Sequence, residues 1–75
     1  MNYRKVFAER LTTLRKSRNL LQKDVSDYLE VTRQAYSLLE NANRSPSFEI
    51  LTALADYFNV SVDYLIGLSD KPERR

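Results

Sequence analysis

The sequence predicts an all-α fold, a compact domain of five short helices. Apolar residues recur at helical spacing along almost the whole chain, and no segment alternates long enough to make a convincing strand. A length of 75 residues leaves room for one domain and little else. We therefore expect a helical domain over residues 1–67, followed by a polar, frayed C-terminal tail over residues 68–75.

The first two helices are predicted from their apolar stripes and end signals. The first is expected over residues 3–18, and Asn19, which tolerates a left-handed backbone, is expected to end it. The second is expected over Gln22–Leu29, with Leu21 at the cap position. Because a cap normally supplies a side-chain oxygen, leucine there should cost on the order of 1 kcal/mol.

The third helix has the most polar outward face. After a tight turn, Thr32 is expected to cap a helix over residues 33–41 by accepting from backbone N–H groups two or three residues on. Tyr36 and Leu39 lie on the inward face. The outward face is rich in hydrogen-bonding groups: Arg33, Gln34, Ser37 and Asn41.

Two more helices follow the only clear loop. Pro46 is expected at the first position of the fourth helix with Ser45 as its cap, and Ser47 as the cap is the close alternative. Ser61 is expected to cap a last, short helix, which Gly67 ends.

The composition argues against an enzyme. The chain has no cysteine and no histidine, and Gly67 is its only glycine. It therefore lacks thiolate metal ligands, the usual general base and a glycine-rich phosphate loop, so we expect no metal, no cofactor and no small-molecule ligand. The sequence has no secretory signal and no apolar run long enough to span a membrane, so we expect a cytoplasmic protein without a membrane partner.

Charge is distributed unevenly along the chain. Residues 1–23 hold seven basic side chains and one acidic, whereas residues 24–75 hold five basic and nine acidic. Such asymmetry can mark a phosphate-facing side. A well-solvated basic helix explains it equally well, and both explanations stay open.

Two short helices joined by a tight turn, with a threonine cap before a polar-faced second helix, describe a helix-turn-helix. Over about residues 7–67 the chain resembles the lambda-repressor/Cro-like family of this motif, the XRE type. The resemblance is carried by the joint spacing of Gln22, Leu29, Val31, Thr32, Arg33, Ser37, Glu40, Asn41, Arg44, Pro46 and Ser47, and then of residues 54–56 and 59–67. It implies a lambda-repressor-like domain with the motif in helices 2 and 3, and double-stranded DNA as partner.

The resemblance also implies roles for individual positions. Base contacts are implied for Arg33, Gln34, Ser37 and Leu38. Phosphate contacts are implied for Gln22, Thr32, Asn41 and Arg44. A largely buried ion pair between the first and third helices is implied for Arg15 and Glu40.

Each role has a plainer alternative. Arg33 matches the two acceptors of guanine and Gln34 can bond adenine, each worth about 1–3 kcal/mol of discrimination, but both could be solvated surface side chains. Leu38 could pack on a thymine methyl group or fill a gap between helices. Arg15 and Glu40 could form a surface pair worth at most about 1 kcal/mol.

Five positions depart from the family pattern. Leu21 stands where the family usually has threonine or serine, and Ser26 where it usually has alanine. Glu30 and Ala42 stand where the family usually has glycine, and Glu30 would have to adopt a positive φ, which a β-carbon disfavours. Tyr36 replaces the usual isoleucine or valine, so its ring needs space and its hydroxyl a partner.

The C-terminal third carries more apolar surface than two short helices need. Some of these apolar residues are expected to form a homodimer contact. The alternative is that all of them complete the core of the monomer. The residues are Tyr57, Phe58, Val62, Tyr64, Leu65 and Ile66. The leading interpretation is a transcriptional regulator, a repressor, that binds a palindromic operator as a homodimer. The competing one is an antitoxin or adaptor-type protein-interaction module, which the polar face of the third helix disfavours.

Overall fold

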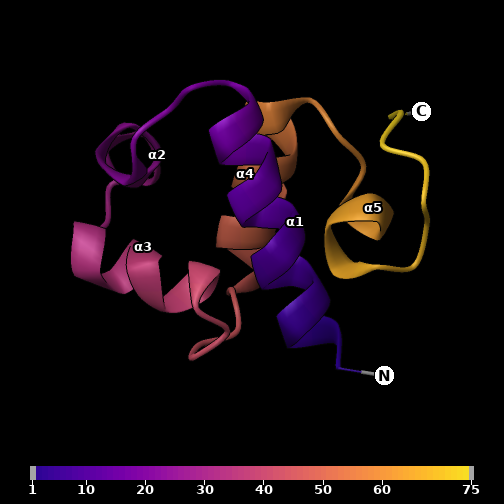
Figure 1. The fold of residues 1–75 in the computed structure, drawn as a ribbon, viewed down its shortest axis with the longest axis horizontal. Helices are drawn as coiled ribbons and strands as arrows, with labels where there is room; N and C mark the ends of the chain where they lie inside the picture. The colour runs from indigo at the N-terminus through magenta and orange to yellow at the C-terminus, as the bar shows by residue number, and fades with distance from the viewer. Residues whose placement is uncertain (1, 75) are drawn as a thin grey trace.

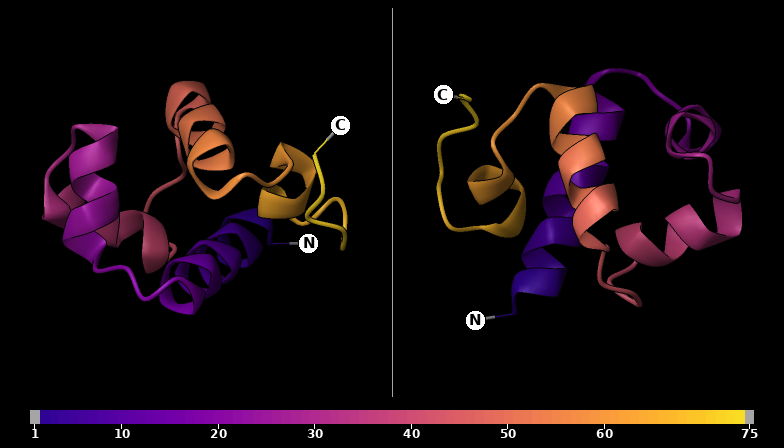
Figure 2. Two further views of the ribbon diagram at one scale, coloured as in Figure 1. Left: turned by 90° about the horizontal axis from the view of Figure 1, so that it is seen from above. Right: turned by 180° about the vertical axis from the view of Figure 1, so that it is seen from behind.

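A computed structural model describes residues 2–74 as five helices joined by short turns. They are α1 (Tyr3–Ser17), α2 (Gln22–Leu29), α3 (Arg33–Glu40), α4 (Phe48–Phe58) and α5 (Val62–Ile66). The described part of the chain contains no strand, so the predicted all-α, five-helix fold is confirmed. Figure 1 shows α2 and α3 on one side of α1 and α4, and α5 with the C-terminal segment on the other. The same arrangement is seen from behind in Figure 2.

One apolar core joins all five helices. Leu11 of α1, Val25 of α2 and Leu54 of α4 have no exposed surface. The other members of the core are Phe7, Tyr36, Leu39, Ala55, Phe58, Val60 and Leu65. Helices as short as α2 and α3 are not stable by themselves, so packing against this shared core both stabilises them and fixes their orientation.

The ends of α1 and α2 follow the sequence closely. α1 stops at Ser17, one residue before the expected end, and Asn19 has a left-handed φ of 57°. The Leu21 side chain makes no cap hydrogen bond, as expected. Instead, its backbone N–H donates to Asp24 Oδ2 at 2.7 Å, which satisfies one donor at the start of α2.

The turn into α3 has the predicted geometry. Glu30 adopts a φ of 58°, and Thr32 Oγ1 accepts from the backbone N–H of Ala35 at 3.0 Å. α3 ends at Glu40, one residue earlier than expected. Ala42, which also stands where the family has glycine, adopts a φ of 61°.

The start of α4 corrects the preferred prediction. Ser47, not Ser45, is the cap, and its Oγ accepts from the Ile50 N–H at 3.1 Å. Ser47 has an extended backbone (φ −69°, ψ 166°), so Pro46 before it belongs to the loop and not to the helix. Pro46 is partly buried there and lines an apolar pocket with Val31 and Ile50.

α5 begins and ends where the sequence predicts. Ser61 Oγ accepts from the Tyr64 N–H at 3.0 Å, and Gly67 has a φ of 89°. A β-carbon at Gly67 would lie 2.7 Å from Val6 Cγ1. Glycine is therefore required both for the left-handed turn and for the close approach of α5 to α1.

The expectation of a frayed tail is wrong for residues 68–74, and residue 75 of that predicted tail lies outside the described residues. The segment folds back onto the domain through polar contacts that its composition did not reveal. The Ser61 N–H donates to Pro72 O at 2.9 Å, Arg10 Nη1 donates to Ser69 O at 2.6 Å, and Arg74 Nη2 donates to Asp56 Oδ1 at 2.7 Å.

None of the helices within residues 2–74 combines the length and the apolar character needed to cross a bilayer.

Candidate nucleic-acid interface

The structure brings Arg15 of α1 and Glu40 of α3 together as an ion pair. Arg15 Nε lies 2.6 Å from Glu40 Oε2, and Arg15 Nη2 donates to Oε1 at 3.1 Å. Only 12% of the Arg15 side chain and 4% of the Glu40 side chain are exposed. Two parallel hydrogen bonds between buried groups fix the angle between the two helices, since a change in angle would break at least one of them.

Two more donors reach the same carboxylate. The Tyr36 hydroxyl donates to Glu40 Oε2 at 2.5 Å, and Gln22 Nε2 donates to Oε1 at 3.1 Å. Arg15 Nη1 also donates to the carbonyl oxygen of Leu20 at 2.9 Å. Glu40 therefore joins α1, α2 and α3 at one point, and the hydroxyl of the buried Tyr36 has its partner.

These donors decide the protonation of the cluster. Burial alone would raise the pKa of Glu40, but hydrogen bonds from Arg15, Tyr36 and Gln22 outweigh it and hold that pKa below its ordinary value. Burial, together with the hydrogen bond to Glu40, raises the pKa of Tyr36. At neutral pH the carboxylate is charged and the tyrosine is a neutral donor.

The hydrogen bond between the Tyr36 hydroxyl and Glu40 was not predicted from the sequence. The available signal was their spacing, since side chains four residues apart lie on the same face of a helix. Residues 22 and 40 belong to different helices, and no local pattern points to their contact.

Burial of Tyr36 and Leu39 turns the opposite face of α3 outward. Arg33 and Gln34, the two residues expected to reach base edges, are exposed at its start. Ser37 is half-buried, and its Oγ accepts from Asn41 Nδ2 at 3.3 Å. Leu38 is half-buried but does not belong to the side chains packed on the core.

The residues expected at phosphates surround this face. Thr32 and Asn41 are exposed at the two ends of α3, and Arg44 is exposed in the loop that follows. Gln22 is half-buried, and its bond to Glu40 places the start of α2 beside the last turn of α3.

The basic excess of residues 1–23 is partly used inside the protein. Arg10 donates to Tyr64 O, and Arg15 donates to Glu40. Arg18 Nη2 donates to Phe58 O at 2.5 Å, and Lys23 pairs with Asp27 at 2.7 Å. Four of the seven basic side chains therefore have internal partners. The charge asymmetry alone does not define an interface.

Of the six residues expected at a homodimer contact, two are buried in the core of the monomer and four are half-buried. Phe58 and Leu65 have no exposed surface and belong to the core of the monomer, so they are not available to a second chain. Tyr57 is half-buried and stacks on Tyr28, with ring centroids 4.4 Å apart. The remaining three residues, Val62, Tyr64 and Ile66, are half-buried on α5.

Comparison with known proteins agrees with this geometry. A sequence model described as helix-turn-helix matches residues 11–65. The chain is 31% identical over 68 residues to the uncharacterized HTH-type transcriptional regulator YobD of Bacillus subtilis, covering 91% of this chain and 61% of the relative. It is 39% identical over 59 residues to the HTH-type transcriptional regulator AnsR of the same species, covering 79% of this chain and 51% of AnsR.

A third relative is the HTH-type transcriptional activator BcrR of Enterococcus faecalis, 35% identical over 61 residues, or 81% of this chain and 30% of that protein. The chain spans about half to three fifths of the length of the Bacillus relatives. No solved structure matches it significantly.

Proposed function

The chain belongs to the lambda-repressor-like, XRE-type helix-turn-helix family, and from this premise we propose that it is a sequence-specific regulator of transcription that reads the DNA major groove with α3. One observation carries the proposal: α3 presents the polar side chains of Arg33 and Gln34 to solvent, while its inward face is held by the buried Glu40 cluster. A short helix held in this way presents its side chains in one fixed orientation, as base reading requires.

Arg33 and Gln34 are the proposed base-reading residues. A guanidinium offers two parallel donors to guanine O6 and N7, and a glutamine amide donates to adenine N7 and accepts from its amino group. Each such bidentate contact discriminates by about 1–3 kcal/mol against the wrong base. Ser37 and Leu38 lie one turn further along. Leu38 is the proposed contact to a thymine methyl group, because it does not pack on the core.

Gln22, Thr32, Asn41 and Arg44 are the proposed phosphate contacts. Thr32, Gln22 and Asn41 each retain a donor after making their internal hydrogen bonds. Thr32 uses an oxygen lone pair as the cap, so its hydroxyl proton stays available, and Gln22 gives one of its two amide N–H groups to Glu40. Contacts of this kind set register and affinity without reading sequence.

We propose that the chain acts as a homodimer in the cytoplasm, through Tyr57, Val62, Tyr64 and Ile66, on a palindromic operator. The two α3 helices would then enter successive major grooves about 34–36 Å apart, the spacing seen for members of this family. A dimer bound over a promoter excludes the polymerase, and repression is the regulatory effect we propose.

Selection of bound duplexes from a random pool tests the proposal. We expect an enriched palindrome with two half-sites 10–10.5 base pairs apart from centre to centre. The matched control is a variant carrying Arg33→Ala and Gln34→Ala, whose substituted residues are exposed, so its fold should persist while enrichment disappears. Failure to enrich any sequence with the natural chain would overturn the proposal.

A further inference from the structure

We infer that residues 69–74, here called the strap, occupy the surface of α5 on which a second copy of the chain docks, so that homodimerisation requires displacement of the strap. The inference rests on the homodimer of the proposed function, but it does not depend on DNA binding.

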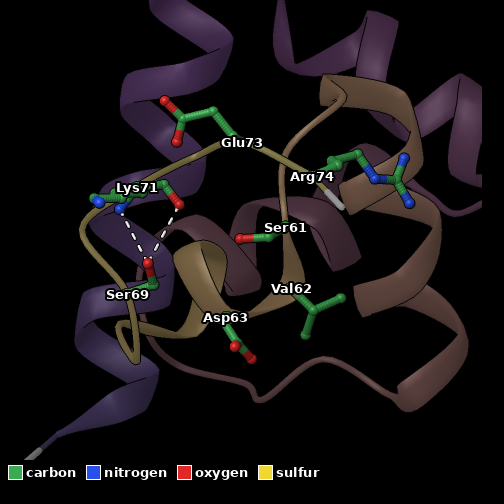
Figure 3. Close-up of a pocket in the computed structure, with 7 residues that line it drawn as sticks. All are labelled: Ser61, Val62, Asp63, Ser69, Lys71, Glu73 and Arg74. Carbon is green, nitrogen blue, oxygen red and sulfur yellow. Dashed lines mark hydrogen bonds between the residues drawn. The ribbon is translucent and has the colours of Figure 1, made fainter.

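The strap crosses the start of α5. Pro72 O accepts from the backbone N–H of Ser61, the residue that caps this helix. Figure 3 shows the strap passing beside Ser61, Val62 and Asp63. On one side Val62 and the strap line a pocket of about 500 Å³, and on the other Tyr64 and the strap line one of about 550 Å³. Two of the four residues proposed for the dimer contact therefore lie next to the strap.

Polar contacts hold the strap at both ends. At the first end, Arg10 donates to Ser69 O at 2.6 Å and to Asp70 Oδ1 at 3.2 Å. At the second end, Arg74 pairs with Asp56 at 2.7 Å. Asp70 and Asp56 are largely exposed, and exposed ion pairs contribute little because water screens them. Ordering the backbone of six residues opposes the contacts that remain, which include the Arg10 bond to Ser69 O and the backbone bonds of Ser61 and Ser69.

The strap cannot seal the apolar surface beneath it. Its sequence is Ser-Asp-Lys-Pro-Glu-Arg, in which Pro72 is the only apolar residue. The open pockets on both sides leave Val62 and Tyr64 half-buried. A partner that covers these side chains removes more apolar area from water than the strap does.

A second copy of this chain fits the surface. Arg10, whose guanidinium lies 4.2 Å from the centre of the Tyr64 ring, loses its strap partners when the strap leaves. Asp63, the only charged residue of α5, is exposed. Arg10 and Asp63 supply both signs of charge around Val62 and Tyr64, and a two-fold axis can place Arg10 of one copy opposite Asp63 of the other.

Sedimentation equilibrium of the full chain without DNA tests the inference. Arg74→Ala removes the bonds to Asp56 and to Ala55 O, and Lys71→Ala is the matched control. Both variants lose one positive charge from the strap, but the Lys71 side chain makes no hydrogen bond within residues 2–74. We expect the dimer dissociation constant of Arg74→Ala to fall about fivefold, the equivalent of one exposed ion pair, and that of Lys71→Ala to stay unchanged.

Amide hydrogen exchange of Ser61 in the monomer gives an independent readout. Exchange should accelerate in Arg74→Ala and not in Lys71→Ala, because the Ser61 N–H loses its acceptor when the strap leaves. A dissociation constant that is unchanged or raised in Arg74→Ala, or purely monomeric chains at high micromolar concentration, would overturn the inference. Selection of an asymmetric single site by the natural chain would then still support DNA reading, so the two proposals can fail separately.

Discussion

Arg15 and Glu40 are 25 positions apart in the sequence and form a two-point ion pair that is almost completely buried. The pair ties the long first helix to the last residue of α3, the helix whose first two residues are Arg33 and Gln34. For a buried ion pair, the loss of one partner costs much more stability than the loss of both. Removing both partners can cost little, whereas removing one leaves an uncompensated buried charge.

Glu40→Ala should therefore lower the free energy of unfolding by about 3–5 kcal/mol. For a domain of this size each kcal/mol corresponds to roughly 4–8 °C in Tm, so the shift should be plain in a thermal melt followed by circular dichroism. Glu9→Ala is the control, because Glu9 is exposed in the middle of α1. A melting curve of Glu40→Ala that overlays the natural one would contradict the structural role of the pair.

Acid should remove the stabilisation that Glu40 provides. The pKa of Glu40 is lower in the folded chain than its ordinary value of about 4.3. Its contribution is therefore fully present above that ordinary value and is lost as pH falls through the lowered folded pKa. Urea unfolding from pH 7 to pH 2 should show the stability gap between the natural chain and Glu40→Gln closing only in acid. A gap that is constant across this range would show that Glu40 does not titrate as the structure requires.

Tyr36→Phe should separate the hydroxyl from the ring. The ring stays buried, but Glu40 loses one of its donors, and hydrogen bonds to charged groups contribute about 1.5–3 kcal/mol. We expect a loss of this size in urea unfolding, together with a rise in the pKa of Glu40 measured by NMR. Tyr3→Phe, at a residue that is 50% exposed, should change neither quantity. Equal stabilities of the two variants would mean that the hydroxyl contributes nothing.

Arg33→Ala and Arg44→Ala should impair DNA binding in different ways. Loss of a base contact at Arg33 should weaken binding to the selected operator by about 1–3 kcal/mol and relax the preference at one base pair. Loss of a phosphate contact at Arg44 should weaken binding to all duplexes alike and reduce the slope of log K against log salt by about one. Fluorescence anisotropy over a salt series measures both, and identical behaviour of the two variants would refute the assignment.

The sequence was most informative where the signals are local. Thr32 and Ser61 carry cap oxygens, and Asn59 and Gly67 tolerate positive φ, so the ends of three helices follow from single residues. The error at Ser45 arose between two competing local signals. Proline at a first helical position and serine at a cap are both favourable, and the partial burial of Pro46 in the loop decided between them.

Non-local contacts were harder to predict. Phe58 and Leu65 look like any other apolar residue of α4 and α5, and only packing of the whole domain assigns them to the core. The folded-back strap depends on Arg10 and Ser61, which lie 59 and 11 positions from the strap residues Ser69 and Pro72 that they contact. Polar contacts of this kind leave no periodic pattern in the sequence.

The turns of this chain leave room for thermostabilisation. Glu30 and Ala42 hold the left-handed backbone without the side-chain compensation that Asn19 and Asn59 can provide. Each strained position costs roughly 1–2 kcal/mol, and glycine would relieve it at a smaller loss in chain entropy. Glu30→Gly and Ala42→Gly are therefore the first substitutions to make for a more thermostable variant, and both leave the proposed base-reading residues of α3 unchanged.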